Sequence, residues 1–318
     1  MILNSSIYFL LGLIALYKGG DFVVDGASKL ARFFKIPHFI VGLTLLAFGT
    51  SAPELVVNII AILNRDSDIV FGNVLGSNIT NIFLILGLTT LFYPIILASQ
   101  IKNTLKNIII SLATCFILIL ILYITKNNHT YMLSMFGGTF LLLFFSIYMY
   151  WITKDKNRMI VSENESSPRA LLKPLFIFVT GLCILPLGGH FIIKAITDIA
   201  FKLNIPTAFI SLFALAVGTS LPELSTCLNA AAKKQYHLVL GNVIGSNIFN
   251  ILLILGTCSL INPLHFSVFF FKDLLWVIGG SCLMLVIVKF YHSLDRKLSF
   301  LFLVIYMVYL YTLFDRFI

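Results

Sequence analysis

The sequence predicts an all-α integral membrane protein with ten transmembrane helices in two inverted five-helix repeats and both termini outside. Three observations support this fold class. The 318 residues are 59% hydrophobic and only 11% charged, whereas a soluble domain is about half apolar and about a quarter charged. The apolar residues fall into ten long segments. The first half of the chain also recurs in the second half, and the repeated unit holds an odd number of these segments.

Each apolar segment is long enough for a membrane-spanning helix, which takes about 20 residues. The residues before the first segment carry no basic cluster, so we interpret that segment as a retained span and not as a cleaved signal. We expect the spans near residues 5–28, 37–63, 69–93, 104–124, 131–152, 173–196, 206–232, 238–261, 272–290 and 298–315.

The basic residues indicate the orientation of these spans. The net charge is +9, and 15 lysines and arginines lie in the loops after the first, third, fifth, seventh and ninth spans, against 6 on the other side. Cytoplasmic loops are the ones enriched in Lys and Arg. The excess charge therefore predicts external termini and not a nucleic-acid partner.

The internal repeat appears when the sequence is shifted by 169 residues. Residues 12–87 then align with residues 181–256 without a gap, and 33 of the 76 pairs are identical. The repeat divides the chain into a first five-helix unit at 1–153 (motif 42–87), a cytoplasmic linker at 154–173 and a second unit at 174–318 (motif 211–256). Because each unit has five spans, the second copy enters the membrane from the opposite side. Inverted repeats of this kind are typical of secondary transporters.

The first repeated block places a carboxylate inside an apolar span in each copy. It reads GTSAPEL at 49–55 and GTSLPEL at 218–224. An intramembrane Glu such as Glu54 or Glu223 is costly and points to a functional site. A structural ion pair is the alternative, but no Lys or Arg lies nearby within these spans. Pro53 and Pro222 lack an N–H, so they free main-chain carbonyls one turn earlier. A kink alone would also explain a proline, although not its pairing with Glu in both copies.

The second repeated block places further oxygens in the next span of each copy. It reads GNVLGSNITNI at 72–82 and GNVIGSNIFNI at 241–251. Its glycines have a plain alternative explanation in close helix packing. Packing does not explain Ser77 and Asn81, one helical turn apart, or their repetition as Ser246 and Asn250.

Together the two blocks offer carboxylate, hydroxyl, amide and carbonyl oxygens without His or Cys. This donor set suits hard cations such as Ca²⁺ and Na⁺. The five cysteines form no CxxC pair, so neither a zinc site nor a disulfide framework is indicated, and we expect no cofactor besides the transported ions. Two bare carboxylates in a low dielectric are strongly unfavourable. We therefore expect a loaded or protonated site to cross the membrane more readily than an empty one, which is the physical basis of exchange.

These motifs resemble the repeats of the cation/calcium exchanger superfamily, in particular the prokaryotic sodium/calcium exchangers. The resemblance implies ion sites between helices 2, 3, 7 and 8, sliding of helices 1 and 6, and a location in the prokaryotic plasma (inner) membrane. The ligands that it implies are main-chain and side-chain oxygens of both copies, namely those of Ala47, Thr50, Ser51, Glu54, Ser77, Asn81, Ala216, Thr219, Ser220, Glu223, Ser246 and Asn250.

The chain departs from part of that superfamily at Asn250, where some members have Asp. This difference leaves K⁺ dependence, stoichiometry and the choice between Na⁺ and H⁺ open. The main functional hypothesis is an antiporter that exchanges Ca²⁺ for Na⁺, and Ca²⁺/H⁺ exchange is the alternative.

A cation channel is less favoured, because channel filters usually arise from symmetric oligomers. The chain has no HExxH or GxSxG motif, so we do not expect an enzyme. Its expected partners are Ca²⁺, Na⁺ and the lipid bilayer, with no nucleic acid and no obligatory protein partner. Outside the motifs, Lys18 and Asp21 lie three residues apart, which would allow an ion pair across one helical turn.

Overall fold

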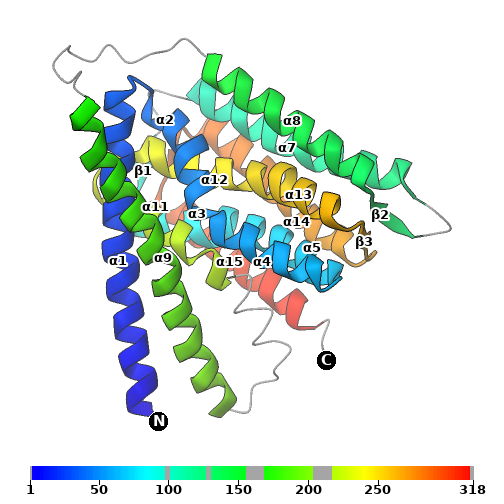
Figure 1. Ribbon diagram of the computed structural model, residues 1–318, viewed down its shortest axis with the longest axis horizontal. Coiled ribbons are helices and arrows are strands. Elements are labelled where there is room, and N and C mark those ends of the chain that lie inside the picture. The colour runs from blue at the N-terminus through cyan, green and yellow to red at the C-terminus, as the bar shows by residue number, and fades with distance from the viewer. Residues whose placement is uncertain (1, 97–100, 127–129, 155–167, 203–216, 316–318) are drawn as a thin grey trace.

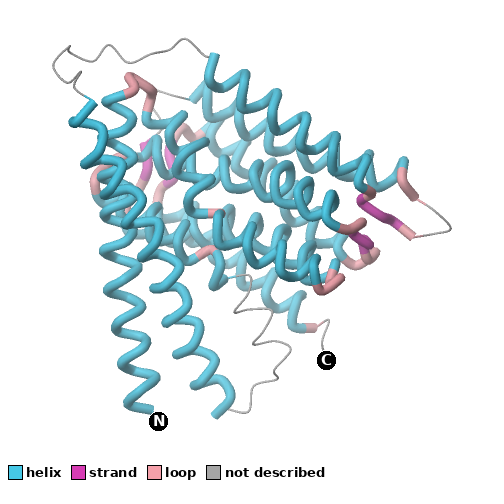
Figure 2. Tube along the Cα trace, viewed as in Figure 1, coloured by secondary structure: helices cyan, strands magenta, loops and turns pink. Residues whose placement is uncertain are grey.

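The computed structural model describes residues 2–96, 101–126, 130–154, 168–202 and 217–315. Helices make up nearly all of these residues, and the few strands are two or three residues long (Figures 1 and 2). The protein is therefore all-α, as the sequence predicts.

The first half begins with one long helix and continues with two interrupted spans and two regular ones. Polar residues mark several ends: the Asp66 side chain accepts a hydrogen bond from the Ile69 N–H at 3.0 Å, which caps the start of a helix. The elements are α1 (Ile2–Phe33); α2 (His38–Val41), π-helix η1 (Gly42–Leu46), α3 (Ala47–Thr50) and α4 (Ala52–Leu63); α5 (Ser67–Ile79), π-helix η2 (Thr80–Ile85) and α6 (Leu86–Phe92); α7 (Ile101–Ile124); and α8 (Met135–Lys154).

In the described part of the second half, which excludes 203–216, the elements follow a similar order. Arg65 and Lys234, which occupy equivalent positions in the two halves, adopt the left-handed conformation, with φ of 61° and 58°, and so end α4 and α11. The elements are α9 (Pro168–Lys202); α11 (Leu221–Ala232); α12 (Tyr236–Phe249), π-helix η3 (Asn250–Ile254) and α13 (Leu255–Ile261); α14 (Phe270–Phe290); and α15 (Arg296–Phe314).

Eight helices or helix runs in the described part of the chain are long and apolar enough to cross a membrane, or nine if the bent pair 38–50 and 52–63 counts as one span. The observed bounds agree with nine of the ten expected spans to within about six residues. The other expected span, at 206–232, is described only from residue 217 onward. The helix α9 starts at Pro168, so the last part of the expected linker 154–173 is helical; proline is well suited to a first helical turn.

Two of the spans form the centre of the molecule. In its most apolar window, the span at 67–92 is 83% buried and the span at 236–261 is 94% buried, whereas the other six are 28–44% buried. These two spans carry the second repeated block. The polar motifs therefore lie in the core, and the outer helices present apolar side chains to the surroundings.

Short antiparallel strands link the two halves at two places. The strand β1 (Ile95–Ile96) pairs with β4 (Ser293–Leu294), and β2 (Tyr131–Leu133) pairs with β3 (Leu264–Phe266). The first pair joins the segment after α6 to the segment between α14 and α15. The second pair joins the segment between α7 and α8 to the segment after α13. The halves are thus fastened to each other beyond their helical contacts.

The helices α1 and α9 lie side by side and form a long pair at one flank of the bundle (Figure 1). Close approach of the pair requires glycine, because a Cβ on Gly181 would lie 2.8 Å from the Gly19 carbonyl oxygen. The helix α1 also packs along α11. The pair flanks the span that carries Glu223.

Candidate functional site

The site begins at a break in a membrane span in each half. Ser51 (φ −85°, ψ 4°) separates α3 from α4, which are bent by 44° from each other, and Ser220 (φ −88°, ψ 2°) precedes α11. Proline follows two residues later in both copies and lies in the first turn, where its missing N–H is tolerated. Glu54 and Glu223 occupy the first turn after these breaks.

The two breaks meet, and each carboxylate faces hydroxyl groups of the other half. The Ser51 Oγ donates a hydrogen bond to Glu223 Oε1 at 2.9 Å, and the Thr219 side chain hydrogen-bonds to Glu54. Both glutamates are only 1% exposed, and each lies about one helical turn from the residue that hydrogen-bonds to the other. The structure therefore brings the repeated glutamates together, away from bulk water.

Reciprocal hydrogen bonds between asparagine side chains hold the second block of each half against that of the other half. The Asn81 Nδ2 donates to Asn247 Oδ1 at 3.0 Å, and the Asn250 Nδ2 donates to Asn78 Oδ1 at 2.9 Å. Asn81 lies in π-helix η2 and Asn250 begins π-helix η3; such wide turns occur often at functional sites. Because these hydrogen bonds fix the side-chain nitrogens of Asn81 and Asn250, the side-chain oxygens of both residues point away from the partner asparagine.

A second reciprocal pair orients the threonines of the first block. Thr50 Oγ1 donates to Asn242 Oδ1, and Thr219 Oγ1 donates to Asn73 Oδ1, both at 3.2 Å. A threonine hydroxyl has one proton to donate, so Thr219 shares its proton between Asn73 Oδ1 and the Glu54 carboxylate. Both threonine hydroxyls retain lone pairs for another contact.

Six buried oxygens of the two blocks have no hydrogen-bond partner among the described residues. Buried polar atoms are nearly always paired in proteins, so a cluster of unpaired oxygens calls for an explanation. They come in equivalent pairs from the two halves: Glu54 Oε2 and Glu223 Oε2, Ser77 Oγ and Ser246 Oγ, Asn81 Oδ1 and Asn250 Oδ1. All six belong to residues that the sequence predicts as ligands.

The remaining expected ligands are placed as follows. Ala47 and Thr50 lie on α3, and the Ala47 carbonyl oxygen already accepts a hydrogen bond from the Ser51 N–H at 3.0 Å. Ser220 is buried beside Glu223. Ala216 lies outside the described residues.

The structural alternatives raised by the sequence can now be weighed. Among the described residues, the glutamates form no ion pair with Lys or Arg, so they are not halves of salt bridges. Close packing does explain a glycine of the second block: a Cβ on Gly245 would lie 2.7 Å from the Leu43 carbonyl oxygen and 2.8 Å from Ala47 Cβ. No cluster of three His, Cys, Asp or Glu side chains occurs in the described ranges, since this site contains two carboxylates and otherwise neutral oxygens.

The sequence interpretation missed the four asparagines that orient these groups, Asn73, Asn78, Asn242 and Asn247. All four are at most 2% exposed. They occupy matching positions in the two copies of the second block, so their repetition was the signal that could have identified them.

The ion pair that the spacing of Lys18 and Asp21 would allow is not the one observed. Asp21 and Asp25 on α1 both contact Lys233, at 2.7 Å and 2.6 Å, just after the end of α11. Burial lowers the pKa of Lys233, but hydrogen bonds and the charges of the two aspartates outweigh it, so that pKa is raised above its usual value. An ammonium that contacts two carboxylates of a neighbouring helix is bound more strongly than one that contacts a single carboxylate of its own helix. These three residues therefore fasten α1 to the C-terminal end of α11.

Comparisons with known proteins agree on one family. The family model described as sodium/calcium exchanger protein matches residues 4–154 and 173–314. The sodium/calcium exchanger MaX1 of Methanosarcina acetivorans is 32% identical over 99% of each chain, and the membrane protein MJ0091 of Methanocaldococcus jannaschii is 37% identical over 77% of this chain and 78% of its own. A solved structure of the sodium-calcium exchanger NCX_Mj superimposes with a TM-score of 0.82 at 33% identity, covering 97% of this chain and 98% of that one.

Proposed function

Since the chain belongs to the sodium/calcium exchanger protein family, we propose that it is a secondary antiporter that exchanges Ca²⁺ for Na⁺ at one shared site. The protein is a membrane transporter of this family and not an enzyme. In this proposal α4 and α5 of the first half and α11 and α12 of the second half enclose the ions.

The six unpaired oxygens, two of which belong to the glutamates, support the proposal. Ca²⁺ takes six to eight oxygen ligands, and Na⁺ accepts the same kinds of oxygen. We assign as ligands Glu54, Glu223, Thr50, Thr219, Ser51, Ser220, Ser77, Ser246, Asn81 and Asn250, together with the carbonyls of Ala47 and Ala216.

Exchange follows from the charge of this site. Glu54 and Glu223 together supply two negative charges, which one Ca²⁺ or two Na⁺ neutralise. The buried carboxylates repel each other when no cation is present, and a buried uncompensated charge is strongly unfavourable. The loaded site therefore changes its access much more readily than the empty one, which couples outward movement of one ion to inward movement of the other.

We further propose the full architecture of ten helices in two inverted five-helix repeats, comprising residues 1–153 and 174–318. The reciprocal amide bonds at related positions, 169 residues apart, support this arrangement. With the termini outside, the linker near 154–173 is cytoplasmic. The inner membrane of a prokaryotic cell is the expected location, and transport requires no obligatory protein partner.

Alternating access is proposed to use the peripheral pair α1 and α9. The helix α1 covers α11, and Lys233 fastens it there. Movement of this pair along the broken spans would expose the glutamates to one side of the membrane at a time, while the strand pairs keep the rest of the two halves together.

The decisive experiment measures ²²Na⁺ and ⁴⁵Ca²⁺ fluxes in proteoliposomes in which the Na⁺ and proton gradients are set separately. Na⁺/Ca²⁺ exchange predicts that Ca²⁺ uptake follows the Na⁺ gradient and vanishes in the Glu54→Gln variant. Uptake that follows only the proton gradient would favour Ca²⁺/H⁺ exchange, and stepwise single-channel currents would favour a channel.

A further inference from the structure

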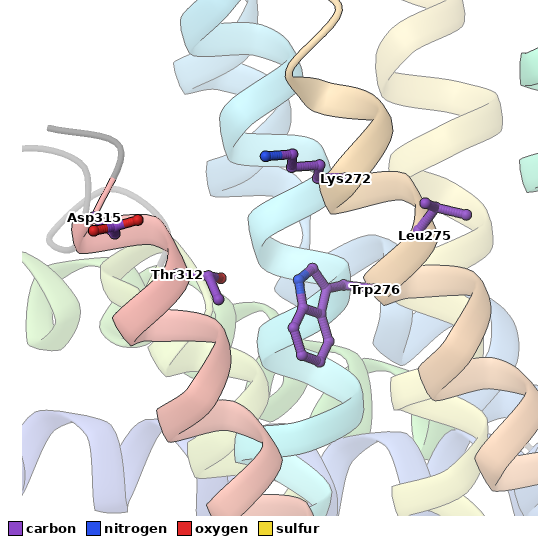
Figure 3. A pocket seen from close by; sticks show the side chains of 5 residues that line it. All are labelled: Lys272, Leu275, Trp276, Thr312 and Asp315. Carbon is purple, nitrogen blue, oxygen red and sulfur yellow. The ribbon is translucent and has the colours of Figure 1, made fainter.

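A groove on the outer surface of the bundle, between α14 and α15, carries one cationic and one anionic side chain on opposite sides. It has a volume of about 430 Å³ and is lined by Lys272, Leu275, Trp276, Thr312 and Asp315 (Figure 3). It is remote from the two glutamates, and the proposed transport does not use it.

The groove lies at the ends of two membrane-spanning helices, at the depth where lipid headgroups are found. Lys272 lies in the first turn of α14, and Asp315 directly follows the end of α15, so both charges lie where spanning helices reach the membrane interface. Trp276 lies one turn further along α14, and tryptophan is enriched at this depth of the bilayer. Its ring contacts the ring of Tyr309 on α15, with centroids 6.0 Å apart, and so forms part of the groove wall.

Within the described ranges, the polar groups of the groove have no ion-pair partner and can bind a ligand. Among the described residues neither Lys272 nor Asp315 forms an ion pair, although Figure 3 shows the Lys272 ammonium directed across the gap toward α15. The indole nitrogen of Trp276 is on the ring edge that faces Lys272 and Thr312. Thr312 Oγ1 donates its proton to the Tyr309 carbonyl oxygen at 2.8 Å, which leaves its lone pairs available as acceptors.

The membrane side of the groove can accommodate an acyl chain. Leu275 is 66% exposed, and Gly279, one helical turn further along α14, has no atom within 4 Å of the place where a Cβ would stand. Lys272, Leu275 or Trp276, and Gly279 follow each other at helical spacing, so they lie on one face. A chain that leaves the groove therefore finds a smooth apolar path along α14.

We propose that this groove binds the headgroup of a zwitterionic aminophospholipid, that is, phosphatidylethanolamine. The phosphate accepts hydrogen bonds from Lys272 Nζ and the Trp276 indole, while the ammonium donates to the Asp315 carboxylate and Thr312 Oγ1. Phosphatidylcholine has the same two charges, but its trimethylated nitrogen has no N–H to donate. Phosphatidylglycerol has the phosphate without the ammonium. A groove with both a donor side and an acceptor side thus prefers phosphatidylethanolamine over either of them.

The chain contains two tryptophans, Trp151 and Trp276, which makes a direct test possible. The Trp151→Phe variant leaves Trp276 as the only indole. It is reconstituted in bilayers that contain equal mole fractions of phosphatidylethanolamine, phosphatidylcholine or phosphatidylglycerol with brominated acyl chains, and quenching of Trp276 fluorescence reports the relative association of each lipid. We expect association with phosphatidylethanolamine to be about fivefold stronger than with the other two, as a partly exposed charge-assisted contact provides.

Two variants complete the test. The Trp276→Phe variant leaves Trp151, which lies under Lys106 at 3.3 Å from ring centroid to Nζ, and it should show no preference for phosphatidylethanolamine over phosphatidylcholine. Adding Asp315→Asn to the Trp151→Phe variant should abolish the preference at Trp276. Equal quenching by the three lipids, the same preference at Trp151, or a preference that survives Asp315→Asn would each overturn the proposal.

Discussion

Replacing Asn78 by leucine should weaken cation binding without changing any proposed ligand. Asn78 Oδ1 accepts the 2.9 Å hydrogen bond that fixes the Asn250 amide, and its Nδ2 donates to the Asn247 carbonyl oxygen at 3.3 Å. Leucine branches at the same carbon as asparagine, and the effect of its larger volume at a buried position is measured by the control variant described below, so the effect specific to the site is the loss of these contacts.

The size of the effect follows from burial. Asn250 is 1% exposed, and a buried donor left without an acceptor costs about 1–3 kcal/mol. Without its tether the Asn250 amide can turn its nitrogen, and not its oxygen, toward the ion. Since about 1.4 kcal/mol corresponds to tenfold in affinity, we expect Ca²⁺ to bind about fivefold to about 150-fold more weakly.

The assay is equilibrium ⁴⁵Ca²⁺ binding to the purified protein, alongside the half-saturating Ca²⁺ concentration for flux in proteoliposomes. Asn107→Leu is the matched control, because Asn107 is also a buried amide: it donates to the Asn103 carbonyl oxygen at 2.8 Å and accepts from the Tyr148 hydroxyl at 3.1 Å, outside the site. It should cost stability but leave Ca²⁺ affinity unchanged. If the Ca²⁺ affinity of the Asn78→Leu protein is within twofold of the parent's, the role assigned to the hydrogen bonds between the asparagines is refuted.

Four other single substitutions test the site and its surroundings. Glu54→Gln and Glu223→Gln should each reduce ⁴⁵Ca²⁺ flux by at least about a hundredfold, because half of the site's charge is lost; substantial flux in either variant would contradict a shared site. Asn250→Asp adds a third negative charge and should change the Na⁺, K⁺ or pH dependence of flux, whereas unchanged dependence on all three would place this residue outside the site. Lys233→Met leaves the α1 aspartates without their cation, and should lower the free energy of unfolding by about 1 kcal/mol and speed amide hydrogen exchange in the last turns of α1; a double variant that also carries Asp25→Leu should recover part of that protection, and no recovery would argue against the ion pair.

The sequence predicts the all-α class and the described spans well, because length and apolar composition decide both. It also singles out the glutamates, since an acidic residue with a proline one position before it, in two copies, has no common structural explanation in a membrane. The structure then brings Ser51 of one copy to Glu223 of the other, a contact that no local pattern contains.

The parts that the sequence did not reveal depend on tertiary structure. The hydrogen bonds that Asn78 and Asn247 accept join helices from different halves. In its local sequence, neither residue differs from an ordinary buried asparagine. The pairing of Asp21 with Lys233 in place of Lys18 has the same cause, because Lys233 approaches α1 only after α11 has packed against it. The π-helical turns have no strong sequence signal either, as their wider hydrogen bonding is selected by the surroundings.

The π-helical turns also constrain how this gene can change by insertion and deletion. A π-helical turn holds one residue more than the α-helical turn it replaces. Removing a single codon within 80–85 would restore a regular helix in which α6 keeps nearly the same orientation relative to α5, because the wide turn already accommodates the extra residue. The contacts of α6 with α15 would then survive, but the wide turn that contains Asn81 would be lost, and with it the direction of the Asn81 oxygen. Natural length variation should therefore accumulate in the segments between spans and be absent from these three turns.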